Sequence, residues 1–233
     1  MSGANGAKME EDVLFSNLRD RLFTAVVGDV LDKMRRRRQF LPQAIAPLRP
    51  DMKLVGRAMP VLEADVFDES PRSPGAVGPK PFGLMLEALD DLRPNEVYVA
   101  TGGSFRYALW GELMSTRARY LRAAGAVLNG FVRDADGIEA LGFPTFCRGL
   151  YAQDQGPRGK VIDFRTVVEI EGVRIAPGDL IFGDREGVLV IPSEVEVEAI
   201  EAALAKASTE NRVAIAIREG MGAREAFETF GVL

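Results

Sequence analysis

The middle of the chain alternates strand-like and helical segments in the order of a βαβ unit. Val97–Ala100 is a short apolar run with two β-branched residues, which predicts a buried strand. A helical segment is expected to follow as far as Ala124, with Gly125 ending it. Ala126–Val132 is a second apolar run and predicts a second strand. Because strands joined by a crossover helix run parallel, both should end at the same edge of one sheet.

Chemically active side chains fall at that edge. Arg133 and Asp134 directly follow the second predicted strand, and Glu112 lies near the start of the helix. Ligands of open α/β sheets bind at the carboxyl ends of strands, and helix N-termini attract anions. Each residue alone has a structural explanation, as a helix-dipole partner or half of a loop ion pair. Together they predict a site that holds a divalent metal and an α-keto acid.

The composition excludes several other classes of site. The chain has no histidine among its 233 residues, so it has no Ser-His-Asp triad, Cys-His dyad or His-ligated zinc. It contains neither a P-loop nor a G-x-G-x-x-G fingerprint. A net charge of −5 argues against a nucleic-acid partner, and the run Arg35–Arg38 fits a solvated helix end better than a nucleic-acid patch.

The apolar runs also bear on location. None is long enough for a transmembrane helix, and the small polar residues at the start of the sequence are not expected to act as a signal peptide. We therefore expect no membrane partner and a cytoplasmic protein. The single cysteine, Cys147, lies in a strand-like apolar run and is expected to be a buried, reduced thiol.

Other periodic segments predict a single α/β domain around the central unit. Helices are expected over Glu11–Met34, after Pro192, and again up to Phe230. Strands are expected over Leu54–Leu62, Val161–Ile170, Val173–Ile175, Leu180–Phe182 and Val188–Ile191.

An acidic cluster invites a metal-site interpretation that the pattern does not favour. Asp65, Asp68 and Glu69 stand close together without a spaced scaffold, so a solvated acidic turn is the better prediction. Pro71–Pro81 is expected to be a mobile loop. The sequence leaves open whether this loop covers the active site.

Glycine-rich motifs recur from residue 102 to residue 188. They are Gly102-Gly103, Trp110-Gly111-Glu112-Leu113, Gly125, Asn129-Gly130-Phe131-Val132-Arg133-Asp134, Leu141-Gly142-Phe143-Pro144, Cys147-Arg148-Gly149, Pro177-Gly178-Asp179 and Gly183-Asp184-Arg185-Glu186-Gly187-Val188. The pattern resembles the RraA-like family, which includes the 4-hydroxy-4-methyl-2-oxoglutarate aldolases. The resemblance implies an N-terminal extension and helix over residues 1–24 and an aldolase domain over residues 25–233. It also implies an α/β/β/α sandwich with a swivelling β/β/α core, assembled as a homotrimer or hexamer.

The resemblance further implies roles for individual residues. Asp134 becomes the direct ligand of Mg²⁺ or Mn²⁺, and Arg133 contacts the keto and carboxylate oxygens of the substrate. The backbone of Gly111, Glu112, Leu113 and Met114 would cradle the pyruvyl carboxylate. Family aldolases tend to carry aspartate where this chain has Glu112, which would hold a metal-associated water that acts as the base. They also borrow a glutamate from a neighbouring subunit, for which Glu210 is the candidate by offset.

Two functions follow as expectations. The first is a class II pyruvate aldolase that cleaves a 4-hydroxy-2-keto acid and decarboxylates oxaloacetate. The alternative is a non-catalytic regulator that binds and inhibits a ribonuclease. Regulators of this family tend to have an acidic residue three positions after the aspartate of the Arg-Asp pair, and here that residue is Gly137. The difference favours the enzyme.

Overall fold

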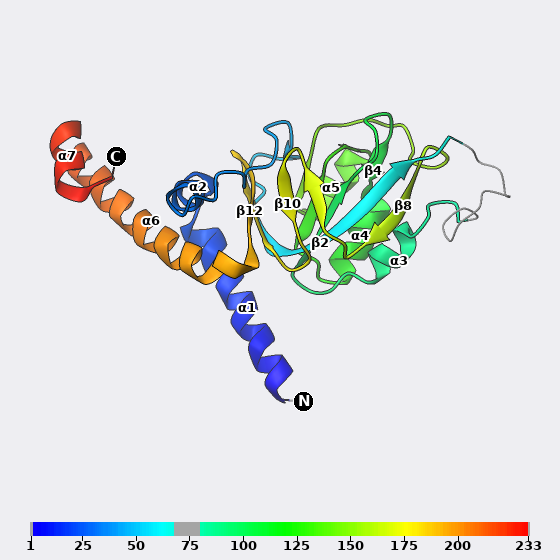
Figure 1. Ribbon diagram of the computed structural model, residues 1–233, viewed down its shortest axis with the longest axis horizontal. Helices are drawn as coiled ribbons and strands as arrows, with labels where there is room; N and C mark the ends of the chain where they lie inside the picture. The colour runs from blue at the N-terminus through cyan, green and yellow to red at the C-terminus, as the bar shows by residue number, and fades with distance from the viewer. Residues whose placement is uncertain (1, 68–79, 233) are drawn as a thin grey trace.

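The protein has a mixed α/β fold built on one large sheet (Figure 1). The computed structural model describes residues 2–67 and 80–232, with the backbone alone over residues 2–10. The helices are α1 (Ser2–Arg21), α2 (Thr24–Lys33), α3 (Met85–Asp90), α4 (Glu112–Tyr120), α5 (Ala135–Leu141), α6 (Glu196–Arg218) and α7 (Ala223–Phe230), with a 3-10 turn at Ser193–Val195. The strands are β1 (Ala46–Pro47), β2 (Leu54–Asp65), β3 (Glu96–Thr101), β4 (Ala108–Trp110), β5 (Gly125–Leu128), β6 (Phe131–Val132), β7 (Thr145–Cys147), β8 (Gly159–Phe164), β9 (Val168–Ile170), β10 (Val173–Ile175), β11 (Leu180–Asp184) and β12 (Gly187–Ile191).

The long strand β2 organises the sheet, whose order is β1-β7-β5-β3-β2-β11-β12. Its first residues pair antiparallel with β11, and its last residues pair antiparallel with β8. On its other side it runs parallel to β3, which in turn runs parallel to β5. The parallel pairing of β3 and β5 confirms the predicted strand–helix–strand unit.

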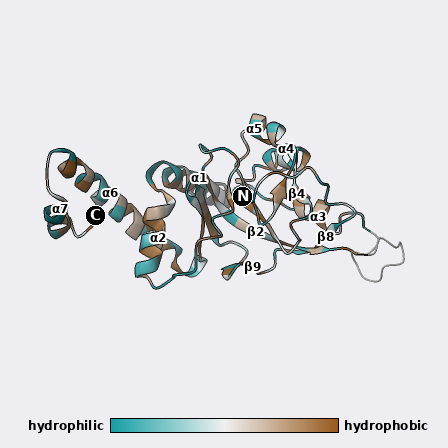
Figure 2. Ribbon diagram, turned by 90° about the horizontal axis from the view of Figure 1, so that it is seen from above, coloured by the Kyte–Doolittle hydropathy of each residue, from teal (hydrophilic) through white to brown (hydrophobic). Residues whose placement is uncertain are grey.

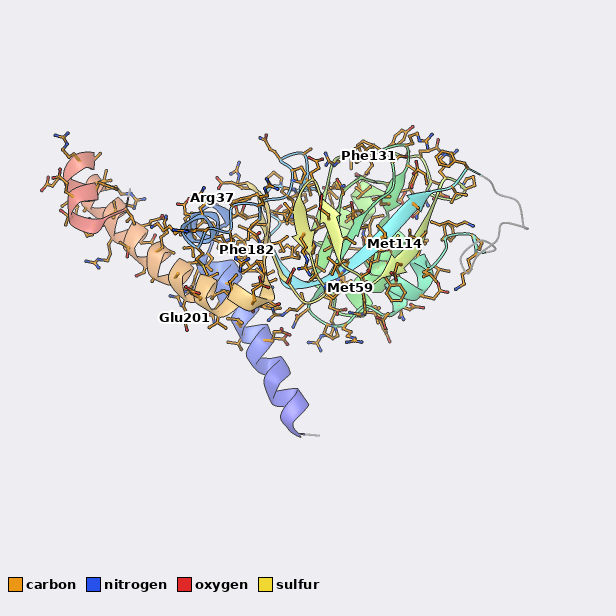
Figure 3. The ribbon with its side chains drawn as sticks, viewed as in Figure 1. Arg37, Met59, Met114, Phe131, Phe182 and Glu201 are labelled. Carbon is orange, nitrogen blue, oxygen red and sulfur yellow. The ribbon has the colours of Figure 1, made fainter. Side chains whose placement is uncertain are left out.

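Apolar side chains on both faces of the sheet form the core. Helices α3, α4 and α5 cover one face, against buried residues such as Met59 and Tyr98. The β9–β10 hairpin covers part of the opposite face, against Val97 and Phe146. At one end of the sheet, α1, α2 and α6 pack around Phe182 of β11. Figure 3 shows Phe182 well apart from Met114 on α4. These layers agree with the predicted α/β/β/α sandwich.

Helices α6 and α7 extend away from the sheet as an arm at the opposite end of the molecule from α3. In Figure 1 this arm lies beyond α2. Figure 2 shows hydrophilic and hydrophobic residues alternating along both helices. In α7 the apolar residues gather on one face, as in an amphipathic helix, whereas in α6 they are spread around the helix. No helix in the described part of the chain is long and apolar enough to cross a bilayer.

The end of α4 differs from the prediction. The helix ends at Tyr120 with Leu121 as its C-cap, and Arg122 adopts the left-handed conformation (φ 64°) that was expected of Gly125. Gly125 instead opens β5, where an added Cβ would lie 2.4 Å from the carbonyl oxygen of Pro144. The glycine is therefore required by the close approach of the chain around Pro144 rather than by the helix end.

The second predicted strand is divided. Its first part, β5, belongs to the large sheet, whereas β6 pairs in parallel with the unpredicted strand β4 in a separate two-stranded sheet. The chain leaves the large sheet at Asn129, whose N–H donates to the carbonyl of Ala100 at 2.9 Å. Gly130 follows, where an added Cβ would lie 2.6 Å from the Leu109 side chain. The Asn-Gly pair thus turns the chain from one sheet to the other.

Other boundaries also shift. The predicted helix over Glu11–Met34 is two helices, because Asp184 accepts hydrogen bonds from the backbone N–H and the hydroxyl of Thr24, both at 2.8 Å, at the start of α2. The predicted strand Val161–Ile170 is divided into β8 and β9. Cys147 is buried as predicted, and burial raises the pKa of its thiol.

Asp65 does not belong to a solvated acidic turn, which corrects that prediction. Its carboxylate accepts hydrogen bonds from the Ser104 N–H at 2.9 Å, the Tyr107 hydroxyl at 2.9 Å and the Arg106 guanidinium at 2.8 Å. It therefore fixes the loop before β4. The predictions for Asp68, Glu69 and most of the Pro71–Pro81 loop lie outside the described residues.

Candidate active site

The small β4–β6 sheet brings the predicted site residues together. Trp110 at the end of β4 lies opposite Val132 at the end of β6, and the N–H of Arg133 donates to the carbonyl of Trp110 at 3.0 Å. Because the two strands are parallel, Gly111 and Arg133 leave the sheet at the same edge. Each strand is then followed by a helix, α4 or α5. The predicted meeting of the two segments is confirmed, although on β4 and β6 rather than on β3 and β5.

Gly111 permits a close approach between these segments. A Cβ at this position would lie 2.9 Å from Oδ2 of Asp134 and 3.4 Å from Cγ of Arg133. Gly111 is the N-cap of α4, and no side chain caps the helix there. The carbonyl of Gly111 accepts a hydrogen bond from the buried Ser115 hydroxyl at 3.1 Å, and that hydroxyl accepts one from the Trp110 indole at 2.6 Å. The turn is thus held from the core side, and its other side is left open.

Asp134 has an unusual backbone conformation. It is the N-cap of α5 with φ 56° and ψ 39°, in the left-handed region. Its carboxylate makes no capping hydrogen bond to the helix that it precedes. Aspartate tolerates this region better than most residues, but the conformation still carries strain, which is common at functional sites. The carboxylate of Asp134 therefore does not cap α5, which is the structural role that an aspartate at this position usually has.

Arg133 lies between two carboxylates. Its Nε is 3.6 Å from Oδ2 of Asp134, and its Nη1 is 3.2 Å from Oδ1 of Asp154. The three side chains are 40%, 47% and 45% exposed, respectively, so all three remain accessible to a ligand. Exposed pairs of this kind contribute little to stability. Their arrangement is better explained by binding.

These groups line a pocket of about 280 Å³. Its polar side carries Arg133, Asp134, Asp154 and Gln155. The rest of the wall is apolar and comes from α3, β4 and α4, including the only tryptophan, Trp110. A volume near the lower end of the ~300–1,000 Å³ typical of ligand pockets suits a small molecule. Leu113 and Met114, which the family resemblance assigns to the substrate site, also line it.

Glu112 lies beside the pocket rather than in its wall. Its side chain passes over α5, where a Cβ added at Gly137 would lie 2.3 Å from Cδ and 2.4 Å from Oε2 of Glu112. The glycine thus makes room for the longer side chain of Glu112. An acidic residue at position 137, as expected of a regulator, would meet this carboxylate directly.

The remaining predicted residue is distant within one chain. Glu210 lies on α6, where it forms an ion pair with Lys206. Helix α6 lies at the other end of the molecule from α4 and α5 (Figure 1). A single chain therefore does not bring Glu210 to the pocket, and its assignment to a neighbouring subunit stays a prediction.

The residues at the pocket fit a magnesium-like cation. No group of three or more carboxylate, cysteine or histidine side chains with metal-site geometry occurs over residues 2–67 and 80–232. Mg²⁺ is commonly held by one or two carboxylates and retains several waters, so a dense cluster is not needed. Asp134 supplies an accessible carboxylate in a cradle that a Cβ at residue 111 would fill. Hard oxygen donors of this type suit Mg²⁺ or Mn²⁺.

Comparison with known proteins shows to which family this chain belongs. Residues 24–190 match the RraA-like family, described as Aldolase/RraA. The chain belongs to the RraA-like family. It is 30% identical over 188 residues to protein DlpA of Legionella pneumophila, which covers 80% of this chain and 29% of DlpA. This RraA-like chain therefore spans less than a third of that relative.

Two further RraA-like comparisons agree with the family. A Halalkalibacterium halodurans protein named "Putative 4-hydroxy-4-methyl-2-oxoglutarate aldolase" is 29% identical over 205 residues, covering 88% of this chain and 89% of the relative. Streptomyces coelicolor RraAS2, described as an unusual member of the RNase ES inhibitor RraA protein family, superimposes with a TM-score of 0.72 at 22% identity. That match covers 85% of this chain and 93% of RraAS2, and it confirms the RraA-like fold.

Sequence reasoning missed two residues of the RraA-like pocket. Asp154 and Gln155 lie in the segment between β7 and β8, about twenty residues after Asp134. No periodicity marks them, and the loop reaches the pocket only through contacts with strands that are distant in sequence. Nothing in the amino-acid pattern singles them out from other loop residues.

Proposed function

We propose that this protein is a carbon–carbon lyase that cleaves a 4-hydroxy-2-keto acid to pyruvate with the help of Mg²⁺ or Mn²⁺. The observation that carries the proposal is the carboxylate of Asp134, which lies against the backbone of Gly111 and beside the guanidinium of Arg133. One small pocket therefore contains both a carboxylate that can bind a cation and a guanidinium that can bind an anion. The aldolase name of the H. halodurans relative supports the same class of reaction.

The assigned roles follow the chemistry of the side chains. Asp134 would bind the metal directly, Glu112 would hold a water, and Glu210 would come from a neighbouring subunit of a homotrimer or hexamer. When bound, the cation supplies Lewis-acid stabilisation of the negative charge that develops on the pyruvyl half. Arg133 pairs with the keto and carboxylate oxygens of the substrate through its guanidinium. Backbone N–H groups of the first turn of α4 bind the same carboxylate.

The reaction breaks the C3–C4 bond of the substrate. The electron pair remains on the pyruvyl half as an enolate, while C4 becomes a carbonyl carbon. The water held by Glu112 takes the proton from the C4 hydroxyl, because the chain has no histidine to do so. Protonation of the enolate at C3 then gives pyruvate. Loss of CO₂ from oxaloacetate leaves the same enolate, so oxaloacetate decarboxylation is expected as a second activity.

Pyruvate release tests the proposal directly. A lactate dehydrogenase-coupled assay would compare 4-hydroxy-4-methyl-2-oxoglutarate, 4-carboxy-4-hydroxy-2-oxoadipate and oxaloacetate, each with Mg²⁺, with Mn²⁺ and with a chelator. We expect turnover of at least one substrate with metal and its loss with the chelator. Absence of pyruvate from every substrate, together with binding to a ribonuclease, would instead establish the regulator. Metal-independent turnover would overturn the roles given to Asp134 and Glu112.

A further inference from the structure

A buried carboxyl group lies behind the pocket and takes no part in the proposed reaction. Glu63 in β2 is only 2% exposed. Its Oε2 accepts a hydrogen bond from Nε2 of Gln155 at 2.9 Å, although the two residues are 92 positions apart in the sequence. Its Oε1 is buried and has no hydrogen-bond partner in the described structure. Because Gln155 lines the pocket, this acid is connected to the site by a single side chain.

The segment around Gln155 is fixed at several points. The Ala108 N–H of β4 donates to the carbonyl of Gln153 at 2.8 Å. The guanidinium of Arg158 donates to the carbonyl of Asp154 at 3.2 Å. The bond from Gln155 to Glu63 is the buried side-chain anchor of this segment. The carboxylate of Asp154 therefore projects from a short segment that these hydrogen bonds hold in place.

Asp154 on this segment contacts Arg133, the arginine proposed to bind the substrate. Oδ1 of Asp154 lies 3.2 Å from Nη1 of Arg133, on the side of the guanidinium away from the Nε that faces Asp134. Each carboxylate thus restrains a different nitrogen of the same planar group. An arginine that binds a keto acid through two parallel hydrogen bonds requires this plane to be oriented before the ligand arrives.

We propose that Glu63 is a positioning residue for the keto-acid site, which fixes Asp154 beside the guanidinium of Arg133 through its hydrogen bond with Gln155. The proposal rests on the proposed function, because Arg133 must bind the substrate for its orientation to affect turnover. Glu63 would thus affect the keto-acid site although it touches neither the substrate nor the metal. It also makes the site sensitive to the protonation of a buried acid.

The charge state of Glu63 follows from its surroundings. Burial, reinforced by the negative charge of Asp65, raises the pKa of the Glu63 carboxyl to about 8. At neutral pH the group is therefore a neutral acid, and Gln155 donates to an uncharged carboxyl. Other titratable or charged groups surround Glu63. On β2 and β3 they are Asp65, which pairs with Arg106, and Tyr98, and Tyr107 lies in the loop before β4. On β8 they are Lys160, opposite Ala64, and Asp163, opposite Leu62.

Ionisation of Glu63 places an unpaired charge in the core. Such a charge is strongly disfavoured unless water or a cation reaches it. Because Oε1 has no hydrogen-bond partner among the described residues and Gln155 links the acid to the pocket, we expect the ionised group to draw in water from the pocket and to displace Gln155. Asp154 then loses its anchor, and Arg133 loses one of the two groups that orient it. Binding of the ligand should therefore weaken as pH rises through about 8.

Oxalate, an analogue of the pyruvate enolate, provides a readout that does not depend on turnover. Its binding would be followed with Mg²⁺ present by fluorescence of Trp110, the only tryptophan, which lines the pocket. The variants are Glu63→Gln, which stays neutral and keeps an acceptor oxygen, Gln155→Leu, which removes the bond, and Glu201→Gln as the matched control. Figure 3 shows Glu201 on α6, at the other end of the molecule from Met114.

We expect the wild-type affinity for oxalate to fall about tenfold for each pH unit above the Glu63 pKa, because only the neutral form is competent. Glu201→Gln should behave in the same way. Glu63→Gln should rescue the binding at high pH, whereas Gln155→Leu should bind weakly at all pH values. If Glu63→Gln does not fold, by circular dichroism, Gln155→Leu carries the test alone.

Three results would overturn the inference. They are an unchanged alkaline loss of binding in Glu63→Gln, wild-type affinity in Gln155→Leu at neutral pH, and no oxalate binding by the wild type at any pH. Failure of the proposed function has a different signature, which is absence of pyruvate from every substrate. A protein that binds oxalate with the expected pH dependence but releases no pyruvate would retain the positioning role and lose the lyase.

Discussion

Arg57 and Arg133 each lie between two carboxylates, at opposite ends of the fold, and they differ in how completely their charges are paired. Arg57 at the helical end joins β2 to α1 and α6. Its Nε donates to Glu11 at 2.8 Å, and its Nη2 donates to Glu196 at 2.9 Å. The guanidinium also lies over the ring of Phe15, with 5.3 Å to the centroid. Every side of this arginine is used within the chain.

Arg133 at the pocket is the open counterpart. Its two ion pairs are longer, at 3.6 and 3.2 Å, and its guanidinium donates no hydrogen bond of normal geometry within the described residues. Its side chain is 40% exposed, against 26% for Arg57. Saturated pairs hold elements together, whereas incompletely paired charges at a pocket remain free to bind a ligand. The same residue types therefore serve structure in one region and chemistry in the other.

The largest expected effect separates the two clusters by activity. Arg133→Ala should lower kcat/KM for pyruvate release by about 10²–10³-fold, the usual loss when one oriented donor to a developing oxyanion is removed. The melting temperature should stay close to that of the wild type, because the pairs of Arg133 are exposed. The coupled assay and thermal unfolding measure the two quantities. A large loss of stability would show that Arg133 is structural and would break the comparison.

Arg57→Ala should show the opposite behaviour. It leaves Glu196, which is 12% exposed, without its bidentate partner. We expect a loss of about 2 kcal/mol, which corresponds to a fall of roughly 4–8 °C in melting temperature for a chain of this size. The kcat/KM of the remaining folded protein should be unchanged. A specific loss of activity, corrected for the folded fraction, would contradict the structural role.

A smaller effect is expected where Glu112 passes over α5. Gly137→Ala should move the Glu112 carboxylate, because the new Cβ would lie 2.3 Å from its Cδ. We expect about a tenfold loss of kcat/KM, less than the ~10²–10⁴-fold that proton transfer contributes, because the carboxylate is displaced rather than removed. Stability should not fall, since alanine favours a helix over glycine by up to ~1 kcal/mol.

The shorter aspartate provides the matched test of this contact. Glu112→Asp does not reach over residue 137, so the double variant Glu112→Asp/Gly137→Ala should recover activity relative to Gly137→Ala alone. A double-mutant cycle of kcat/KM measures this coupling. Strictly additive losses would show that the two positions act independently.

The smallest expected effect concerns Asp65, a fully paired carboxylate close to the pocket. Although burial opposes it, hydrogen bonds from Ser104, Arg106 and Tyr107 lower the pKa of Asp65 to about 2. The stability that it provides is therefore present above its ordinary pKa and is lost as pH falls through about 2. Asp65→Asn should lower the melting temperature by a few degrees at neutral pH and less so in acid. A difference that is independent of pH would contradict this assignment.

The sequence predicted a large part of the fold because much of its signal is local. The apolar runs at Val97–Ala100, Leu180–Phe182 and Val188–Ile191 became strands close to the expected bounds. The glycine and proline turns between the later strands were equally clear. Boundaries failed where a distant contact decided them, as when Asp184 capped Thr24 and divided one predicted helix into two.

The candidate site was predicted in part for the same reason. The Arg133-Asp134 pair was recognisable because it directly follows an apolar run, and Gly111 because it belongs to the family motif Trp110-Gly111-Glu112-Leu113. The structure brings these residues within contact. Asp154 and Gln155 were not recognisable. They lie in a loop with no periodic pattern, and only the pairing of β4 with that loop brings them to the pocket.

By itself the sequence determined the strand and helix types, the family, and the presence of an arginine and carboxylates beside glycines. Only the tertiary structure decided which strands carry the site, that Gly137 makes room for Glu112, and that Glu63 meets Gln155 across 92 residues. The physical reason is that backbone propensity and hydrophobic period act over a few residues. Close approaches, buried hydrogen bonds and shifted pKa values arise only when distant segments pack together.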